Sequence, residues 1–304
     1  MTQAWTAECS VSADLARSLI EAQFPQMVLA SVEPFGAGWD NTAFLVNDTL
    51  VFRFPRRQIA VPLLEAEARL LPVLAERLPL PIPVPTFVGP PTASYPWPFG
   101  GYPLLPGRTA CSANLDDEQR QALAAPLARF LATLHTTPAA WAAHHGAGPD
   151  PIERLDIARR LPRLRELLAQ FAAHHLVEDV RPLTALADAA PAVYVPRADT
   201  LVHGDLYVRH LLVNEDKRLA GVIDWGDIHL GDPAADLMVA HSFLPPTAHD
   251  AFRAAYGQMD STAWNIARLR ALWHTANVLS YAQDVGDVDL LREGQRGLRY
   301  LALT

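Results

Sequence analysis

The chain has 304 residues, of which half are apolar, and its formal charge is −8. This length and composition predict a globular protein with one large domain or two lobes. No block of basic residues stands out, so nucleic acid is not expected as a partner. No apolar run reaches the roughly 18 residues of a membrane helix, so no membrane partner is expected either.

The two cysteines, Cys9 and Cys111, are too few for a disulfide framework or a cysteine-based metal site. The first residues lack a basic start followed by an apolar segment, so we expect no signal peptide. Both observations favour a cytoplasmic location. Nothing in the sequence indicates an oligomeric state.

The first part of the chain is predicted to form a helix followed by strands. Ser12 can cap a helix over 12–24. Strands are expected over 27–35, 42–46 and 50–54. The first turn contains Gly36 and Gly38, and glycines in such a turn let backbone N–H groups approach phosphate oxygens. On its own, however, a Gly-x-Gly turn usually does no more than reverse the chain.

A leucine-rich face predicts a second helix over about 60–78. The proline-rich segment 79–106 should be extended, because proline lacks an N–H and disfavours helix in the residue before it. Strands are expected near 87–88 and 101–105.

The remainder of the chain reads as mostly helical. Apolar residues recur at helical spacing over 116–135, where Pro126 predicts a kink or a helix start. Further helices are expected within 138–198 and after Asp236. An acidic cluster near the C-terminus comprises Asp284, Asp287, Asp289 and Glu293. Such a cluster is usually a solvated face, but at the edge of a cleft it could bind amines.

Between 201 and 236, two short apolar runs flank a polar turn. The runs 211–213 and 219–223 predict a hairpin, with Asp205 and His210 before its first strand and Asp224 after its second. A hairpin brings its open ends together, so these three side chains can converge. One carboxylate could accept a hydroxyl proton, and the other could hold a divalent cation together with the histidine.

A kinase needs both functions, because phosphoryl transfer depends on positioning the nucleophile and neutralising phosphate charge. Any one of these aspartates could instead be an ordinary turn residue, since loop aspartate is common. The whole pattern of His-Gly-Asp-Leu, strand, turn, strand and Ile-Asp-Trp-Gly favours the kinase interpretation.

Three motifs resemble those of the aminoglycoside phosphotransferase family, a branch of the protein-kinase-like fold that includes macrolide, choline and methylthioribose kinases. His203-Gly204-Asp205-Leu206 resembles its catalytic loop, which implies that Asp205 is the base. Ile223-Asp224-Trp225-Gly226 resembles its metal-binding segment. Gly231-Asp232-Pro233-Ala234-Ala235-Asp236 resembles the segment that supports the catalytic loop. His210 stands where the family usually has Asn, and the resemblance implies that His210 and Asp224 hold Mg²⁺.

The resemblance also implies a nucleotide site. Gly36 and Gly38 would lie in the nucleotide-positioning loop, and Arg53 stands at the position of the phosphate-binding lysine of kinases. A planar guanidinium can grip phosphate and carboxylate together. Glu67 would pair with Arg53. Arg56, Arg57 and Glu65 remain alternatives for these two positions.

The segment 102–107 resembles the hinge between kinase lobes, where backbone groups bind the nucleotide base. Leu104 and Leu105 would supply those groups. Because backbone rather than side chains would bind the base, the sequence does not separate ATP from GTP.

We therefore predict an α+β, two-lobed protein-kinase-like fold. Residues 1–105 would form an antiparallel-sheet, nucleotide-binding lobe, and residues 106–304 a larger helical, catalytic and substrate-binding lobe. The predicted function is transfer of the γ-phosphoryl group of ATP or GTP, with Mg²⁺, to a hydroxyl of an antibiotic. The acidic cluster favours an aminoglycoside acceptor. A macrolide, a metabolite or a catalytically weak nucleotide-binding pseudokinase are the alternatives.

Overall fold

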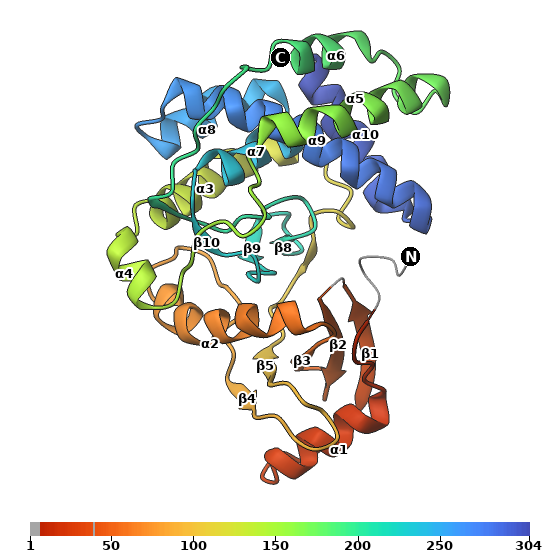
Figure 1. Cartoon of the computed structure of the whole chain (residues 1–304), viewed down its shortest axis with the longest axis vertical. Helices are drawn as coiled ribbons and strands as arrows, with labels where there is room; N and C mark the ends of the chain where they lie inside the picture. Colours follow the sequence, from red (N-terminus) through yellow and green to blue (C-terminus); the bar gives the residue numbers. More distant parts are fainter. Residues whose placement is uncertain (1–6, 39) are drawn as a thin grey trace. The chain divides into compact units, whose positions relative to one another are not determined.

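The computed structural model describes residues 7–38 and 40–304 (Figure 1). The N-terminal residues 1–6, which bear on the signal-peptide prediction, and Trp39 in the predicted glycine turn lie outside the described residues. The chain divides into two compact units, one of Met1–Arg77 with Pro81–Leu105 and one of Leu78–Leu80 with Pro106–Thr304. Within the described residues, no helix combines the length and the apolar character that crossing a membrane requires.

The smaller unit contains a five-stranded antiparallel sheet in the order β1-β2-β3-β5-β4. Its strands are β1 (Val32–Ala37), β2 (Asn41–Val46), β3 (Leu50–Pro55), β4 (Phe87–Gly89) and β5 (Phe99–Pro103). Its helices are α1 (Ala13–Gln23), the short 3-10 turn η1 (Gln58–Ala60) and α2 (Val61–Ala75).

Alternation along β3 separates two faces of this sheet. Phe52 and Phe54 are fully buried in a cluster that includes Ile20 of α1. Phe54 also stacks on Phe99 with ring centroids 4.6 Å apart. Because successive strand residues point to opposite faces, Arg53 projects away from this aromatic core.

Strand β1 begins later than the sequence indicated. The side chain of Asn47 accepts the N–H of Ala30 at 2.8 Å and donates to the carbonyl of Val28 at 2.8 Å. These bonds hold the residues before Val32 as a loop. Gly36, predicted to lie in the turn, is part of β1 and sits at a shift in register.

The larger unit is mainly helical. Its helices are α3 (Asp117–His135), α4 (Ala139–His144), α5 (Ile157–Ala173), α6 (Arg181–Asp188), α7 (Ala234–Phe243), the 3-10 turn η2 (Pro246–Ala248), α8 (His249–Tyr256), α9 (Ser261–Val285) and α10 (Val288–Ala302). Its strands are β6 (Arg108–Thr109), β7 (Thr200–Val202), β8 (Leu211–Val213), β9 (Leu219–Val222) and β10 (His229–Gly231). They form a three-stranded sheet in the order β6-β8-β9 and a separate β10-β7 pair.

Helix α7 is the centre of the helical packing. Nine of its ten residues are buried, and it packs against α9 and α10. In α10, Gly297 permits close approach, since a β-carbon there would lie 2.8 Å from the carbonyl oxygen of Ser242 at the end of α7. Helices α7, α9 and α10 therefore pack together to form the core of the helical lobe.

Helix α3 does not start at Pro126, which was one of the two sequence-based expectations. Asp116 and Gln119 form a capping box, and the helix continues through Pro126 to His135. The capping bonds and a buried face that includes Leu123, Leu127 and Phe130 offset the one backbone hydrogen bond that a proline removes.

The predicted fold class is confirmed: a small antiparallel-sheet lobe with a packed helix, and a larger helical lobe.

Candidate functional site

The loop from His203 to His210 connects β7 to β8. Its first turn requires glycine, because Gly204 has a φ of +88° and an added β-carbon would lie 2.4 Å from the carbonyl oxygen of Asp227. Strand β10 pairs with β7 and brings that carbonyl against the loop.

Asp236 of α7 holds the start of this loop. Its carboxylate accepts the backbone N–H of His203 at 2.7 Å and that of Gly204 at 2.8 Å. It also accepts His135 Nε2 at 3.1 Å. Burial would raise the pKa of Asp236, but the hydrogen bond from His135 and the other donors hold it below its usual value. The buried carboxylate is therefore ionised and fully used in bracing the loop.

His203 links the loop to the end of β9. Its Nε2 donates to the carbonyl of Ile223 at 3.0 Å, and its Nδ1 accepts the N–H of Asp205 at 3.3 Å. These partners require the neutral ring protonated on Nε2. Burial lowers the pKa of His203, which favours the same neutral form.

His210 and Asp224 face each other across the open end of the β8-β9 hairpin. His210 Nδ1 donates to the carbonyl of Asp205 at 2.7 Å, and Nε2 lies 3.3 Å from Asp224 Oδ2. In the neutral ring, Nε2 therefore carries the lone pair and points toward the carboxylate. Asp224 has a φ of +64°, uncommon for a residue with a side chain, and its side chain is half exposed.

Asp205 has a carboxylate that is partly exposed and closely surrounded by donors and cations. Its Oδ1 lies 3.2 Å from His274 Nε2, and its Oδ2 lies 3.7 Å from His210 Nδ1. Burial opposes ionisation, but the hydrogen bond from His274, together with the charge of Arg270, holds the pKa of Asp205 well below its usual range. Asp205 is therefore ionised.

Two buried arginines donate hydrogen bonds to the backbone of the loop. Arg154 Nε donates to the carbonyl of Gly204 at 3.0 Å, and Arg270 Nη2 donates to the same oxygen at 3.4 Å. Arg154 also pairs with Asp150 and Asp227. Burial lowers the pKa of Arg270 to about 10, so its guanidinium remains charged at neutral pH.

The sequence analysis missed Arg154, Arg270 and His274. A signal for two of them was present: Arg270 and His274 are polar residues one helical turn apart on α9, a helix whose neighbouring residues are largely buried. Periodicity alone does not reveal which loop they contact.

In the smaller unit, Arg53 and Glu67 form an ion pair at 3.3 Å. Glu67 is 3% exposed, and its carboxylate also accepts the hydroxyl of Tyr102 at 3.0 Å. The alternative Glu65 is exposed on α2. The helix register thus selects Glu67 as the partner of Arg53.

The alternatives to Arg53 hold the turn between β1 and β2. Arg56 donates to the carbonyl of Gly38 at 2.8 Å, and Arg57 pairs with Asp40. Gly36 and Gly38 have open space where a β-carbon would lie. Within the described residues, crowding therefore does not require glycine at either position.

The predicted hinge residues lie just after β5. The N–H of Leu104 donates to the carbonyl of Thr49 at 2.8 Å, which extends the β3-β5 pairing. Leu104 is exposed and Leu105 is half-buried. The N–H of Leu104 is thus engaged within its own unit.

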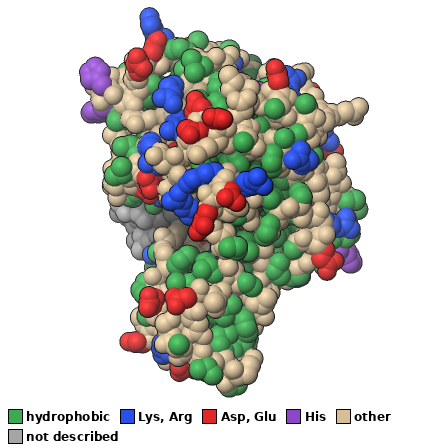
Figure 2. Space-filling model, turned by 180° about the vertical axis from the view of Figure 1, so that it is seen from behind, with side chains coloured by type: hydrophobic (Ala, Val, Ile, Leu, Met, Phe, Trp, Pro, Cys, Tyr) green, Lys and Arg blue, Asp and Glu red, His purple; other side chains and the backbone are tan. Residues whose placement is uncertain are grey.

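The acidic cluster near the C-terminus does not form a free set of carboxylates. Asp287 caps α10 and pairs with Arg209. Asp289 pairs with Arg292 at 2.8 Å, and buried Glu293 pairs with Arg120 at 2.6 Å. Across the helical unit as seen in Figure 2, acidic and basic side chains likewise lie next to one another. Three of the four carboxylates of the cluster, those of Asp287, Asp289 and Glu293, thus have an arginine partner, and Asp284 is exposed.

The two compact units, with an ion-paired arginine on the sheet and Asp205, His210 and Asp224 at one end of a hairpin, define the kinase-like class of phosphotransferases. The model of the Phosphotransferase enzyme family matches residues 31–272, and the chain belongs to that family.

Solved structures of related enzymes share the fold over nearly the whole chain. The GDP complex of aminoglycoside 2'-phosphotransferase-IIIa is 27% identical with a TM-score of 0.67, covering 96% of this chain and 99% of that one. Macrolide 2'-phosphotransferase MphH from Brachybacterium faecium is 25% identical with a TM-score of 0.57, covering 93% of this chain and 98% of that one.

Curated relatives match over shorter stretches. Viomycin phosphotransferase from Streptomyces vinaceus is 34% identical over 123 residues, which are 39% of this chain and 41% of that protein. The uncharacterized protein YcbJ from Bacillus subtilis (strain 168) is 28% identical over 71 residues, 23% of either chain. The matched stretches span less than half of each curated relative.

Proposed function

We propose that this protein transfers the γ-phosphoryl group of a nucleoside triphosphate to a hydroxyl group of a small-molecule antibiotic. The observation that carries the proposal is the convergence of ionised Asp205 with His210 and Asp224 at the open end of one hairpin. The family membership supports the same reaction class.

Asp205 is the catalytic residue of this proposal. The acceptor hydroxyl would donate its hydrogen bond to the Asp205 carboxylate, and its oxygen would attack the γ-phosphorus. The bond from that phosphorus to the β,γ-bridging oxygen breaks, the nucleoside diphosphate leaves, and the hydroxyl proton passes to Asp205. Because the pKa of Asp205 lies well below its usual value, we assign it chiefly to orienting the hydroxyl, with proton transfer late in the step.

His210 and Asp224 fit a magnesium ion that a nucleotide brings with it. The described residues contain no group of three or more His, Cys, Asp or Glu side chains arranged to hold a metal ion. One carboxylate and one imidazole lone pair suffice where phosphate oxygens and water complete the shell, as is usual for Mg²⁺ at nucleotide sites. When bound, the ion would neutralise charge on the phosphates.

The smaller unit, residues 1–105, would bind the nucleotide. Arg53, held by buried Glu67, would contact phosphate oxygens, and the backbone at Gly36 and Gly38 would approach them. Backbone groups at Leu104 and Leu105 would face the base. Since the N–H of Leu104 is bonded to Thr49, its carbonyl is the group we assign.

An aminoglycoside is the acceptor that we propose first. The GDP complex and the GDP and kanamycin complex of related aminoglycoside phosphotransferases are 27% and 26% identical to this chain, with TM-scores of 0.67 and 0.64. A macrolide is the second candidate, supported by the 25% identical macrolide enzyme. Viomycin belongs in the same test because its phosphotransferase shares the most similar stretch of sequence described above. We further propose a cytoplasmic location, which suits the free thiols of Cys9 and Cys111.

A phosphate-transfer screen tests the proposal. Kanamycin, viomycin, a macrolide and small alcohols would be incubated with the full-length chain, Mg²⁺ and either ATP or GTP, and the phosphorylated product detected by mass spectrometry. We expect turnover of an antibiotic, and Asp205→Asn should lower kcat at least ~100-fold with little change in nucleotide affinity.

Asp199→Asn, a change at an exposed aspartate outside the loop, is the matched control and should keep wild-type turnover. If nucleotide binds but none of the acceptors is phosphorylated, a non-catalytic nucleotide-binding module would replace the enzyme. Wild-type turnover by Asp205→Asn would remove Asp205 as the catalytic residue.

A further inference from the structure

His274 of α9 is the side chain that touches the Asp205 carboxylate from a distant part of the chain. Its Nε2 lies 3.2 Å from Asp205 Oδ1, and the two residues are 69 positions apart. The imidazole is 15% exposed. It packs edge-on against Tyr207 of the same loop, with ring centroids 5.1 Å apart. The contact is therefore built by α9 and the loop together.

The hydrogen in this contact belongs to the histidine. A carboxylate is ionised near pH 7 and can only accept, so Nε2 must carry the proton. Burial lowers the pKa of His274, against the raising effect of the hydrogen bond to Asp205, so the ring is neutral near pH 7. The neutral ring protonated on Nε2 leaves Nδ1 without a proton.

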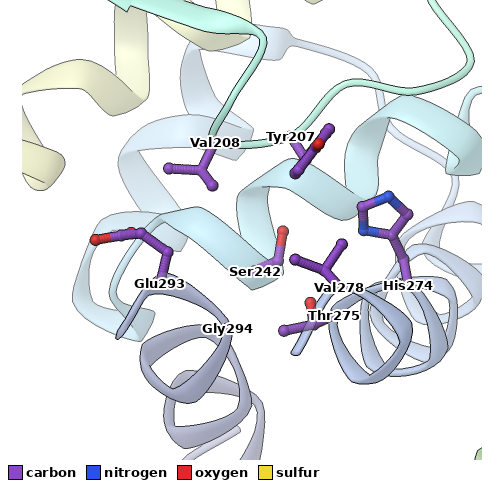
Figure 3. A pocket seen from close by; sticks show the side chains of 8 residues that line it. All are labelled: Tyr207, Val208, Ser242, His274, Thr275, Val278, Glu293 and Gly294. Atoms are coloured by element: carbon purple, nitrogen blue, oxygen red, sulfur yellow. The ribbon is translucent and has the colours of Figure 1, made fainter. Parts of the chain in front are cut away.

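The other side of the ring meets a small pocket. Figure 3 shows His274 and Tyr207 on one side of it and Glu293 on the other, with Ser242 of α7 between them. Its volume of about 20 Å³ is enough for a single water molecule. His274 thus lines a space about the size of one water molecule.

The two oxygens of Asp205 differ in their partners. Oδ1 receives the His274 hydrogen bond, whereas no residue in the described part of the chain donates a hydrogen bond to Oδ2. The ring nitrogen His210 Nδ1 lies 3.7 Å from Oδ2 but gives its hydrogen to the Asp205 carbonyl instead. The torsion that rotates an aspartate carboxylate is broad, so an unanchored carboxylate would not keep one oxygen in one place.

We propose that His274 is a positioning residue, whose neutral Nε2–H fixes Asp205 Oδ1 and thereby aims Oδ2 at the acceptor hydroxyl. The proposal rests on the proposed function of Asp205. Under this proposal, α9 supplies the residue that orients Asp205 toward the acceptor. A partial rotation of the Asp205 carboxylate would move Oδ2 away from the acceptor hydroxyl. This would lower kcat, because catalysis here depends on orientation.

Three substitutions separate this role from simple packing. The amide nitrogen of glutamine reaches the position of imidazole Nε2, whereas that of asparagine ends nearer Nδ1, and phenylalanine keeps the ring but has no donor. We expect kcat to fall about 10- to 100-fold in His274→Asn and His274→Phe, and at most a few-fold in His274→Gln. Acceptor KM and nucleotide affinity should change little. His174→Gln, at an exposed histidine of the same unit, is the control.

Equal kcat for the Gln and Asn variants, or wild-type kcat for His274→Phe, would overturn the proposal. So would a loss confined to acceptor KM, which would make His274 a contact for the acceptor.

A second measurement does not require turnover. In ¹⁵N-histidine-labelled full-length protein, the His274 signals, assigned by their loss in His274→Gln, should report a neutral ring protonated on Nε2 near pH 7. Asp205→Ala should shift them. A ring protonated on Nδ1, or signals insensitive to Asp205→Ala, would overturn the proposal even if the acceptor were never found. Failure of the acceptor screen with the expected NMR result would instead count against the proposed function alone.

Discussion

Four histidines in or near the loop from His203 to His210 differ in how their ring nitrogens are hydrogen-bonded. His203 uses both nitrogens on backbone groups, as donor and acceptor. His135 bridges Asp236 and the hydroxyl of Tyr256, which lie 3.1 and 2.8 Å from its two nitrogens. His210 and His274 each use one nitrogen in a hydrogen bond. The first two histidines therefore have both ring nitrogens hydrogen-bonded and are structural. The second nitrogen of His210 lies 3.3 Å from Asp224 Oδ2.

The Nε2 atom of His210, proposed as a metal ligand, gives a prediction about the preference for Mn²⁺ over Mg²⁺. Imidazole nitrogen binds Mn²⁺ better relative to Mg²⁺ than an amide oxygen does. His210→Asn, which replaces a nitrogen ligand by oxygen, should lower the ratio of Mn²⁺-supported to Mg²⁺-supported kcat several-fold. Initial rates with each metal at saturation would measure it, and His174→Gln should leave the ratio unchanged. An unchanged ratio in His210→Asn would remove His210 as a ligand.

The Arg53–Glu67 pair gives a second prediction at the residue scale. Removing Arg53 takes an ion-pair partner from a buried carboxylate that also accepts a hydrogen bond from Tyr102. Arg53→Ala and Glu67→Ala should therefore be non-additive, with a coupling energy of roughly 1–3 kcal/mol in kcat/KM for nucleotide. A double-mutant cycle measures the coupling. Pairing Arg53→Ala with Glu65→Ala, at the exposed glutamate of α2, should give additive losses.

At the scale of elements, α7 is an almost completely buried helix that nevertheless carries polar side chains. It carries Asp236, which accepts hydrogen bonds from the loop, and five residues further along it carries His241. The His241 ring is buried and packs on Trp264 with centroids 4.1 Å apart, beside His249. Burial, reinforced by His249 and Arg268, lowers the pKa of His241 well below its usual value.

This burial predicts acid sensitivity. Below about pH 6.5 the unfolded chain binds a proton at this histidine that the folded chain does not, so the free energy of unfolding falls as the pH falls. Between pH 7 and pH 5.5, one such group costs about 1 kcal/mol. His241→Phe keeps an aromatic ring against Trp264 and should remove that loss, as measured by urea unfolding at the two pH values. His174→Gln should keep the wild-type pH dependence, and an identical dependence in His241→Phe would contradict the argument.

At the scale of the whole molecule, a bound nucleotide should stabilise the folded chain. Ligand at about 100 times its Kd adds about 2.7 kcal/mol, which corresponds to a rise in Tm of roughly 4 °C for a chain of this size. We expect this rise with ATP or GTP plus Mg²⁺, and a clearly smaller rise in Asp224→Asn or with EDTA. Asp284→Asn, at an exposed aspartate, is the control. A rise independent of Mg²⁺ would favour a nucleotide-binding module without metal-dependent chemistry.

The sequence by itself determined the features that depend on neighbours along the chain. Apolar periodicity located the β8-β9 hairpin and the helices α1, α2 and α3 within a few residues, because burial follows the period of each element. For 138–198 and the chain after Asp236 it indicated helices without their bounds. The hairpin also fixed the convergence of His210 with Asp224, since its two ends must meet. The family resemblance indicated Glu67 as the partner of Arg53 and left Glu65 as the alternative, and the structure pairs Arg53 with Glu67.

Only the tertiary structure decided what distant segments do to these groups. His274 and Arg270 reach Asp205 and Gly204 across more than sixty residues, and the path depends on how α9 packs against α7. Asp287 and Glu293 of the acidic cluster pair with arginines from distant segments, Arg209 and Arg120, which the sequence did not indicate. Local patterns encode which face of an element is buried. The partner of a buried polar or charged side chain depends instead on three-dimensional packing, because a buried polar group must find a hydrogen-bonding partner among whatever segments lie beside it.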